Sequence, residues 1–373
     1  MKYQIVKSQE ALVSVCEAAR RAEKVMLDTE FVRIRSYFPK LGLVQLFDGE
    51  QLSLIDPLEL HDLEPLAELL RDESVLKVLH ACGEDLEVFQ NDLGCLPTPM
   101  LDTQIMAAFL GHGLSTGFAS LVNEYLGVEL DKSESRADWT ARPLTQKQLD
   151  YAAADVHYLW PLYETLAQKL SQTPWQAAAQ DESASLAAKR IKTIEPTKLY
   201  RDIKGAWQLK PKQLAILQPL AAWRYKEAVK RDLALNFIFK ENELLDIASN
   251  GVTSTKTMEG MGIDPRSIRR HGERIVQIVK KAQNVSKESY PASITRVVDL
   301  PGYKQEFKLL KDEVKKASAK TGLATEFLAS KKQLNQFIRW VKDYDMSVER
   351  KPDVMKGWRA ECFEERLVKL LKR

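Results

Sequence analysis

Residues 25–31 (Val-Met-Leu-Asp-Thr-Glu-Phe) constrain the chain more than any other stretch. Three apolar residues predict a buried β-strand, and two acids follow them at alternate positions. Side chains two residues apart in a strand share a face, so Asp28 and Glu30 are expected side by side. Two neighbouring carboxylates repel each other, and a cation between them relieves the repulsion. The alternative is an exposed strand end with two solvated acids, and the rest of the chain must decide between the two.

Length and composition indicate a multidomain globular protein. A chain of 373 residues exceeds one ordinary domain, so two or three are expected. No apolar run approaches the ~20 residues that span a membrane, and the N-terminus lacks the apolar core of a signal peptide. The four cysteines form no C-x-x-C pair, which favours a reducing compartment over a thiolate zinc site. We therefore expect a cytoplasmic protein that does not associate with membranes.

Charge is distributed unevenly along the chain. Residues 1–170 contain 15 Lys and Arg against 27 Asp and Glu, a net of −12, whereas residues 171–373 contain 40 against 25, a net of +15. An acidic half suits divalent metal, and a basic half suits a polyanion, because Lys and Arg neutralise phosphates and release counterions. A solvated helical surface laced with salt bridges explains the basic half equally well.

The first 130 residues predict a mixed sheet flanked by helices. Asp48-Gly49 is a strong hairpin signal between two apolar runs. After this antiparallel meander, short strands alternate with helical patterns, which implies helices on the faces of the sheet. The expected strands are residues 3–6, 25–31, 41–47, 51–55 and 75–79, and the expected helices are one after Ser8, one that includes residues 86–89, and those at 63–70, 103–110 and 114–125.

A helix with a clear N-terminal capping signal is predicted after the polar residues 131–144. Thr145 and Gln148 form the T-x-x-Q pattern of a capping box and predict a helix from about residue 146 to 170, disturbed at Pro161. Residues i and i+4 of a helix lie on one face, so Tyr151 and Asp155 are expected to point the same way. The three alanines between them allow the helix to approach a sheet closely.

A fourth acid, Asp85, lies just beyond a predicted strand end, where α/β sheets collect ligands. Mg²⁺ and Mn²⁺ prefer carboxylate and water ligands. Two such ions about 3.5–4 Å apart can clamp the attacking and leaving oxygens of a phosphodiester. Asp28, Glu30, Asp85 and Asp155, with the Tyr151 phenol to orient a water, are the groups which that mechanism needs.

The chain thus carries three motifs in order: Asp28-Thr29-Glu30, His80-x-x-x-x-Asp85 and Tyr151-x-x-x-Asp155. They resemble the motifs of the DEDD exonucleases, in the subclass with tyrosine. The resemblance covers roughly residues 3–170 and implies an α/β, RNase H-like exonuclease domain. It also implies roles for the five site residues. Asp28, Glu30 and Asp155 would ligate the ion that activates water, Asp28 would bridge to a second ion held by Asp85, and Tyr151 would position the water.

The C-terminal half predicts only helices and contains a repeat. Residues 237–247 and 327–337 match in the spacing of their apolar positions and start 90 residues apart, which indicates two related modules. The modules resemble HRDC domains, and the whole arrangement resembles that of the bacterial ribonuclease D family. The expected division is an exonuclease domain at 1–170, a linker at 171–208, and two all-α HRDC-like domains at 209–290 and 295–373.

The resemblance implies a 3′→5′ exoribonuclease that uses two divalent ions, Mg²⁺ or Mn²⁺. Such an enzyme removes nucleotides stepwise from RNA 3′ ends and releases nucleoside 5′-monophosphates. The implied substrates are tRNA precursors and other structured RNAs with 3′ extensions. The motifs leave two alternatives open, a proofreading-type DNA exonuclease and a non-catalytic nucleic-acid-binding adaptor. The chain has no G-x-S-x-G and no Walker A sequence, which argues against a serine hydrolase and against a nucleotide cofactor.

Eight further residues are candidates for contact with the substrate, each with a structural alternative. These candidates are His80, Lys132, Arg136, Arg142, Lys226, Lys230, Arg231 and Lys240. A histidine at a strand end also packs well, and basic residues in loops and on helices are often only solvated. Asp102 is expected to cap a helix rather than to bind metal. Phe237 and Phe239, which lie among the later lysines, are expected in the core.

Overall fold

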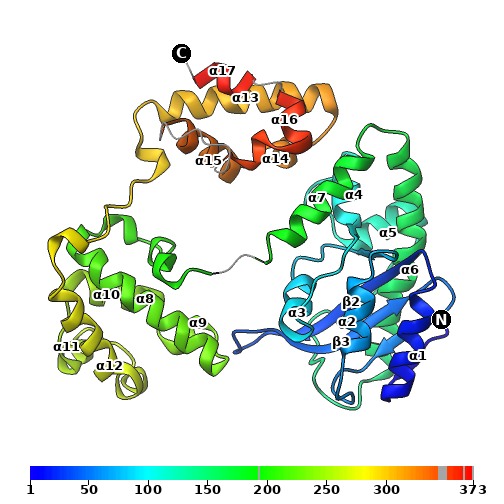
Figure 1. Cartoon of the computed structure of the whole chain (residues 1–373), viewed down its shortest axis with the longest axis horizontal. Helices are drawn as coiled ribbons and strands as arrows, with labels where there is room; N and C mark the ends of the chain where they lie inside the picture. Colours follow the sequence, from blue (N-terminus) through cyan, green and yellow to red (C-terminus); the bar gives the residue numbers. More distant parts are fainter. Residues whose placement is uncertain (192–193, 343–350, 364–365, 372–373) are drawn as a thin grey trace. The chain divides into compact units, whose positions relative to one another are not determined.

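The computed structural model describes residues 1–191, 194–342, 351–363 and 366–371 (Figure 1). The chain divides into two compact units. The first contains Met1–Val32, Pro39–Lys192 and Gly302–Arg373, and the second contains Arg33–Phe38 and Thr193–Pro301. Small parts of the predicted linker and of the last predicted domain lie outside the described residues. No helix within the described part of the chain is long and apolar enough to cross a membrane.

The N-terminal 188 residues form an α/β domain. Its strands are β1 (Gln4–Val6), β2 (Lys24–Val32), β3 (Lys40–Phe47), β4 (Leu52–Ile55), β5 (Leu76–Leu79) and β6 (Met100–Asp102). Its helices are α1 (Gln9–Ala19), α2 (Glu64–Arg71), α3 (Asp85–Asp92), α4 (Thr103–Phe109), α5 (Phe118–Leu126), α6 (Gln146–Ser171) and α7 (Gln176–Ala188).

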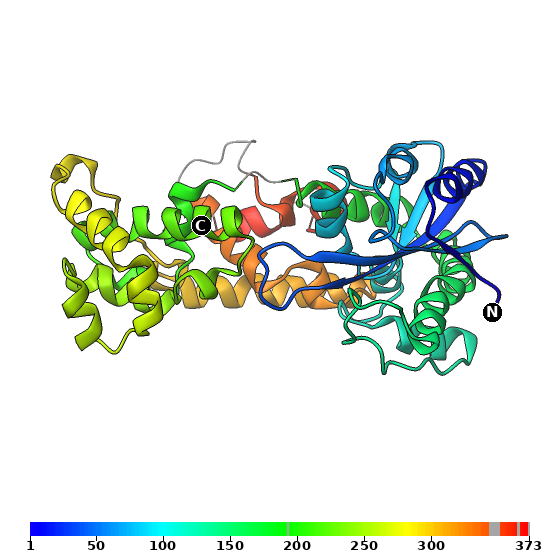
Figure 2. The ribbon, with the colours of Figure 1, turned by 90° about the horizontal axis from the view of Figure 1, so that it is seen from below.

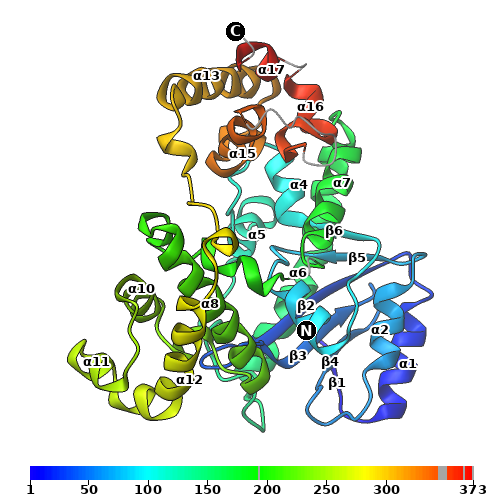
Figure 3. The same ribbon diagram turned by 60° about the vertical axis from the view of Figure 1, so that its left-hand side comes forward.

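The six strands form one mixed sheet in the order β1-β4-β3-β2-β5-β6 (Figure 3). Strands β2, β3 and β4 make the antiparallel meander, while β1 runs parallel to β4 and β5 and β6 run parallel to β2. The mixed sheet with flanking helices is therefore confirmed. The strand with the two acids, β2, lies in the interior of the sheet, where its side chains are covered on both faces.

Each face of the sheet has its own core. Leu12 of α1, Leu66 of α2 and Phe89 of α3 pack on one face. Ala152 and Val156 of α6 pack on the other. In Figure 2 the sheet is seen near its edge, with α1 on one side and the helices that include α6 on the other. The face covered by α6 is the one to which Asp28 and Glu30 belong, because Met26, two residues earlier, lies in the α6 core.

Helix α6 begins as the sequence predicts. The Thr145 hydroxyl accepts a hydrogen bond from the Gln148 backbone at 3.2 Å, and the Gln148 side chain accepts one from the Thr145 backbone at 3.0 Å. The expected disturbance at Pro161 does not end the helix, which runs unbroken for 26 residues. Gly49, at the hairpin turn, has φ +98°, and a Cβ there would lie 2.7 Å from the Trp160 ring. The turn therefore needs glycine both for its backbone and for its packing on α6.

Most of the predicted linker is structured. Helix α7 packs on the first unit, with Ala179 and Ser183 fully buried. A 3₁₀ helix, η1 (Pro196–Arg201), belongs to the second unit, where Tyr200 is buried in the helical core. The sequence predicted a connector here because Ala, Ser and Gln dominate its first part and Glu195-Pro196 interrupts it, but small residues suffice for close helix packing.

The two helical domains repeat one pattern. The first has α8 (Pro211–Arg231), α9 (Leu235–Ile238), α10 (Glu241–Asn250), α11 (Thr255–Gly260) and α12 (Pro265–Gln283). The second has α13 (Tyr303–Thr321), α14 (Thr325–Leu328), α15 (Lys331–Lys342), α16 (Gly357–Phe363) and α17 (Arg366–Leu371). In each, a long helix leads to a one-turn helix and then to another helix, and α9 and α14, like α10 and α15, start 90 residues apart. This is the offset that the sequence repeat predicts.

The C-terminal helices attach to the α/β domain through a buried ion pair. The Arg359 guanidinium of α16 donates to both oxygens of Glu182 on α7 and to the Phe327 carbonyl. The Trp358 indole also donates to Glu182, at 3.0 Å. The pKa of Glu182 is lowered, because these hydrogen bonds and the Arg359 charge outweigh burial. The side chains of Arg359 and Glu182 are only 8% and 16% exposed, so neither charge is well solvated.

We predict that Glu182→Gln destabilises the protein by roughly 3–5 kcal/mol, because it leaves the buried Arg359 charge without a counter-charge. The control is Asp353→Asn, which removes the exposed ion pair with Lys189 on the same side of α7 and should cost at most about 1 kcal/mol. Urea unfolding followed by tryptophan fluorescence measures both. Equal effects of the two substitutions would contradict a dominant role for the buried pair.

Candidate active site

Three carboxylates converge between the sheet and α6. Asp28 and Glu30 lie on β2 and Asp155 on α6, and each offers an oxygen within 4.8 Å of the other two. The buried Ala152 and Ala153 allow α6 to approach the sheet closely enough for this. The register of β2 against β3 shifts between Glu30 and Phe31, a bulge of the kind that redirects side chains beside functional sites. These three acids are brought together as the sequence motifs predict.

The pKa values of all three acids are raised, above all by burial. Burial, followed by the charges of neighbouring acids, raises the pKa of Asp28 well above its usual value and that of Glu30 to about 9. Burial raises the pKa of Asp155 to about 7. The protein alone therefore does not hold all three as carboxylates at neutral pH. A divalent cation among them would reverse this, because it favours the charged form of each ligand.

The fourth acid lies close by on a different element. Asp85 is the first residue of α3, and its carboxylate accepts a hydrogen bond from the Thr29 hydroxyl of β2. Burial raises its pKa to about 6, although the Thr29 hydrogen bond opposes the shift. Asp85 is not within the 4.8 Å cluster, but its charge contributes to the raised pKa values of Asp28 and Glu30. The role of Thr29 was not predicted from the sequence, because Thr29 and its hydrogen-bond partner Asp85 are 56 residues apart in the chain.

A strained turn sets the position of Asp85. Ala81 has φ +53°, which is uncommon for a residue with a side chain. The Asp102 carboxylate accepts hydrogen bonds at 3.0 Å from the backbone nitrogens of Ala81 and Cys82 and so stabilises the turn. The same carboxylate accepts from the Gln104 backbone at 2.8 Å and caps α4. Asp102 is thus an N-cap, as predicted, and it also holds the chain that leads to Asp85.

Tyr151 faces the same cluster. It lies one helical turn before Asp155, and its ring centroid is 6.0 Å from that of the buried Trp139. Burial, together with the charges of Asp155, Glu30 and Asp28, raises the pKa of Tyr151. The phenol therefore stays neutral over the physiological range. It can donate a hydrogen bond to a water beside the acids, but it does not act as their base.

Arg142 is a structural residue and does not serve as a phosphate contact. Its five N–H groups donate to both Asp56 carboxylate oxygens and to the backbone carbonyls of Gly42, Trp139 and Ala141. A guanidinium has only five donors, so none remains for a substrate. The prediction failed because Asp56 is 86 residues away in sequence. The hydrogen bonds fasten the loop that presents Trp139 to Tyr151.

The other candidates in the α/β domain fall into two groups. The His80 ring is packed: its Nδ1 lies 2.9 Å from the Thr103 hydroxyl, and its centroid is 5.5 Å from that of Phe118. This is the structural alternative that the sequence left open for it. Lys132 and Arg136 are exposed on the loop before α6, and neither forms an ion pair with any of the described residues.

In the second unit the candidate lysines and arginine are exposed, but they differ in their partners. Arg231 pairs with Glu227 at 2.7 Å and Lys240 with Glu243 at 3.3 Å, whereas Lys226 and Lys230 have no ion pair among the described residues. Of the two phenylalanines expected in the core, Phe239 is buried and Phe237 is 50% exposed. The prediction for Phe237 was therefore wrong.

Helix α12 carries a basic surface that was not predicted from the sequence. Six exposed basic side chains lie on this helix: Arg266, Arg269, Arg270, Arg274, Lys280 and Lys281. Its apolar residues form one buried stripe, so the charges gather on the opposite face. The helical spacing of the arginines was visible in the sequence and could have identified this face.

The donor set matches a hard divalent cation. Four acids with raised pKa values lie on β2, α3 and α6, and oxygen ligands of this kind bind Mg²⁺ and Mn²⁺. The neutral phenol at their side can hold a water. On a mixed sheet flanked by helices, this arrangement defines a metal-dependent exonuclease of the DEDD type.

The comparisons with known families agree with this assignment. A family described as 3′-5′ exonuclease matches residues 3–171, the HRDC domain matches residues 213–279, and the C-terminal HRDC domain of ribonuclease D matches residues 301–367. Ribonuclease D of Serratia proteamaculans (strain 568) is 46% identical over 373 residues, with 100% of both chains covered. Ribonuclease D of Escherichia coli (strain K12) is 45% identical over 372 residues, covering 100% of this chain and 99% of that protein.

The structure of this chain also resembles that of a solved ribonuclease D. The crystal structure of E. coli RNase D matches with a TM-score of 0.96 and covers 100% of this chain and 99% of that one. The catalytic core of Trypanosoma brucei RRP6 matches with a TM-score of 0.62 at 24% identity, over 75% of this chain and 79% of that one, and shares the fold. The chain belongs to the ribonuclease D family and is a 3′→5′ exoribonuclease. The two alternatives, a DNA exonuclease and a non-catalytic adaptor, are not favoured.

The raised pKa values predict how the metal-free protein responds to pH. A carboxylate whose folded pKa exceeds its unfolded value of about 4 stabilises the fold while protonated, and this stability is lost as pH rises towards the folded pKa. We expect the melting temperature without metal to fall between about pH 4 and 9, from the unfolded pKa of these carboxyls to the highest folded pKa among Asp85, Asp155 and Glu30.

The Asp155→Asn variant serves as the reference, because all other titrating groups are shared. The melting temperature of the variant minus that of the wild type should increase with pH in the absence of metal. Excess Mg²⁺ should stabilise the wild type and leave the variant nearly unchanged. A temperature difference that does not vary with pH would contradict a raised pKa of Asp155 in the folded protein.

Proposed function

We propose that the four acids bind two divalent ions, Mg²⁺ or Mn²⁺, and that the site removes nucleotides one at a time from RNA 3′ ends. The observation that supports this most directly is the three-carboxylate cluster within 4.8 Å, with Asp85 beside it. Two ions, when bound, would lower the pKa of the attacking water and stabilise the leaving alkoxide. The products would be nucleoside 5′-monophosphates.

The residues divide the task by their positions. Asp28, Glu30 and Asp155 would hold one ion, because their oxygens converge. Asp28 would also contact the second ion, which Asp85 would hold directly or through water, with the Thr29 hydroxyl fixing the Asp85 carboxylate. The Tyr151 hydroxyl would donate to the attacking water and orient it towards the terminal phosphate.

We propose structured RNAs with 3′ extensions, tRNA precursors among them, as the substrates, and the cytoplasm as the place where they are processed. The crystal structure of the E. coli relative is described as that of an exoribonuclease involved in structured RNA processing. The division of charge supports the same substrate class. The basic helical half would contact phosphates of the RNA body while a 3′ end enters the acidic site.

Helix α12 is the strongest candidate for that contact. Arg274 and Lys281 of α12, with Lys226 of α8, line a pocket of about 750 Å³ that also includes Trp223 and Ile278. Basic groups around an apolar floor suit phosphates with their attached bases and riboses. Lys132 and Arg136 would contact the strand near the active site.

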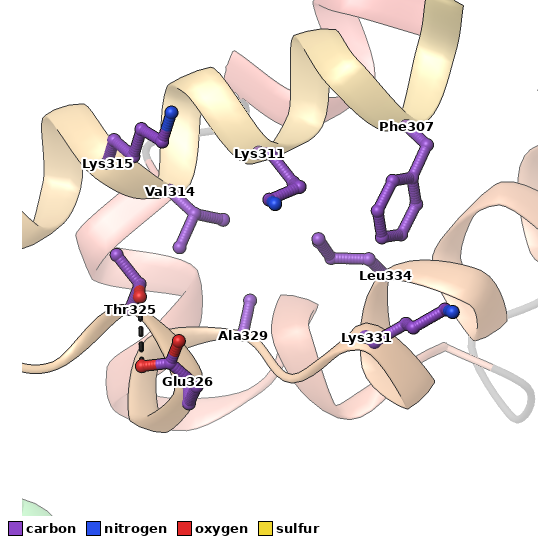
Figure 4. A pocket seen from close by; sticks show the side chains of 9 residues that line it. All are labelled: Phe307, Lys311, Val314, Lys315, Thr325, Glu326, Ala329, Lys331 and Leu334. Carbon is purple, nitrogen blue, oxygen red and sulfur yellow. Dashed lines mark hydrogen bonds between the residues drawn. The ribbon is translucent and has the colours of Figure 1, made fainter. Parts of the chain in front are cut away.

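The second helical domain offers a smaller pocket of about 490 Å³ between α13, α14 and α15. Lys311, Lys315 and Lys331 are among its lining residues; Figure 4 shows Lys311 beside Leu334 and Phe307, and Lys315 farther along, beside Val314. We propose that it contributes to the same RNA contact, with the Phe307 ring available for a base.

The catalytic proposal predicts the behaviour of Asp28→Asn. The variant should release mononucleotides from a 3′-extended RNA at least about 10²–10³-fold more slowly. A catalytic metal stabilises the charge of the transition state by several kcal/mol, and the variant lacks one of the ligands that hold the metal. It should remain folded, since one repelling acid is removed. The assay identifies products after digestion with Mg²⁺, Mn²⁺ or chelator. Metal-dependent release by the variant at the wild-type rate would refute the assignment.

The RNA-binding proposal predicts a salt-dependent effect of α12. Combined replacement of Arg269, Arg270 and Arg274 by Ala should weaken binding to a tRNA precursor and reduce the slope of log affinity against log salt by about 2–3. The matched control replaces Lys2, Lys7 and Arg21, three exposed basic residues of the α/β domain, by Ala. Turnover of a short unstructured RNA should be unchanged in both. The same loss of affinity in both variants would indicate a nonspecific effect of net charge.

A further inference from the structure

One buried polar side chain beside the acids has no hydrogen-bond partner. Gln45, on β3, is completely buried, and both its amide nitrogen and its amide oxygen lack a partner among the described residues. Buried amides are normally satisfied, because leaving them unpaired costs their full desolvation. Gln148, buried in the same domain, follows this rule through its capping box. Gln45 therefore needs an explanation.

Its position in the sheet limits what its partner can be. Gln45 lies directly opposite Asp28 in the antiparallel pairing of β3 with β2. Side chains that face each other across such a pair lie on the same face, with Cβ atoms about 4.5–5.5 Å apart. That face is the one where Asp155 meets Asp28 and Glu30.

The other neighbours of Gln45 in the strand register are apolar. Along β3 its neighbours on this face are Leu43 and Phe47, and across β4 its partner is Leu54. The alanines and valine of α6 cover them. A purely structural side chain here would be apolar like its neighbours. The nearest polar side chain in the register is the Asp28 carboxylate.

We infer that Gln45 is a positioning residue for the metal site, a conclusion that rests on the proposed function. In the metal-loaded protein its amide N–H donates to the Asp28 carboxylate and fixes which oxygen of that carboxylate faces the cations. This role would explain why β3 carries a glutamine among leucines. Second-layer hydrogen bonds of this kind orient ligands, and their loss typically weakens metal binding about 10–100-fold.

The test replaces Gln45 with Met, which has nearly the same length and no hydrogen-bonding group. Mn²⁺ alone is titrated into the full chain and followed by the electron paramagnetic resonance of the free ion. The Gln45→Met variant should bind Mn²⁺ about 10–100-fold more weakly. Its kcat on RNA at subsaturating metal should fall while KM for RNA stays the same. Its melting temperature without metal should equal or exceed that of the wild type, because an unpaired buried amide has been removed.

Two comparisons make the outcome decisive. Ser53→Ala removes another fully buried polar group, bonded to Gln4 on the opposite face of the sheet, and should lower stability without changing Mn²⁺ affinity. Asp28→Asn should abolish tight Mn²⁺ binding, and binding at the wild-type level by that variant would refute the proposed function itself. If Asp28→Asn loses Mn²⁺ but Gln45→Met binds it as the wild type does, only the role of Gln45 is refuted. Gln45→Leu is measured in parallel, so that the test can still be made if one of the two Gln45 variants fails to fold.

Discussion

The repulsion among buried carboxylates is the constraint on which the rest of this structure depends. Asp28, Glu30 and Asp155 lie within 4.8 Å of one another, and Asp85 adds a fourth charge nearby. Burial makes the repulsion strong, since the charged forms lose solvation as well as gaining like neighbours. The surrounding structure has to hold these groups together without metal. The six-stranded sheet, the long capped helix α6 and the Asp102-supported turn provide that rigidity, each through hydrogen bonds that do not use the side chains of the four active-site acids.

The sequence predicted the parts of the site that depend on local periodicity. The alternation of a strand placed Asp28 beside Glu30, and helical spacing with a capping box placed Tyr151 one turn from Asp155. It also predicted the 90-residue repeat of the helical domains, because apolar spacing reflects the helices themselves. Local rules sufficed in these cases because each pair of residues belongs to a single element.

The remaining features depend on contacts between distant segments, and no local rule reaches them. Thr29 bonds Asp85 across 56 residues, and Arg142 bonds Asp56 across 86. For Arg142 the result was a wrong prediction, because a loop arginine ahead of a catalytic helix has the same local sequence whether it binds phosphate or a buried aspartate. Register is equally invisible before the sheet is known. Only the pairing of β2 with β3 places Gln45 opposite an acid.

Two of the buried charge clusters in the first unit differ in how each is compensated. Glu182 meets Arg359, its pKa is lowered, and the pair joins α7 to the C-terminal helices. At the active site no basic side chain among the described residues forms an ion pair with Asp28, Glu30 or Asp155, and the pKa values of Glu30 and Asp155 are raised instead. Compensation within the chain gives stability, whereas compensation left to a cation gives affinity for that cation. A positively charged side chain placed among these acids would therefore stabilise the fold and remove the reason for metal to bind. The acidic and basic halves of the chain fit the proposed function, in which the acids bind metal cations and the basic side chains of the helical domains contact RNA phosphates.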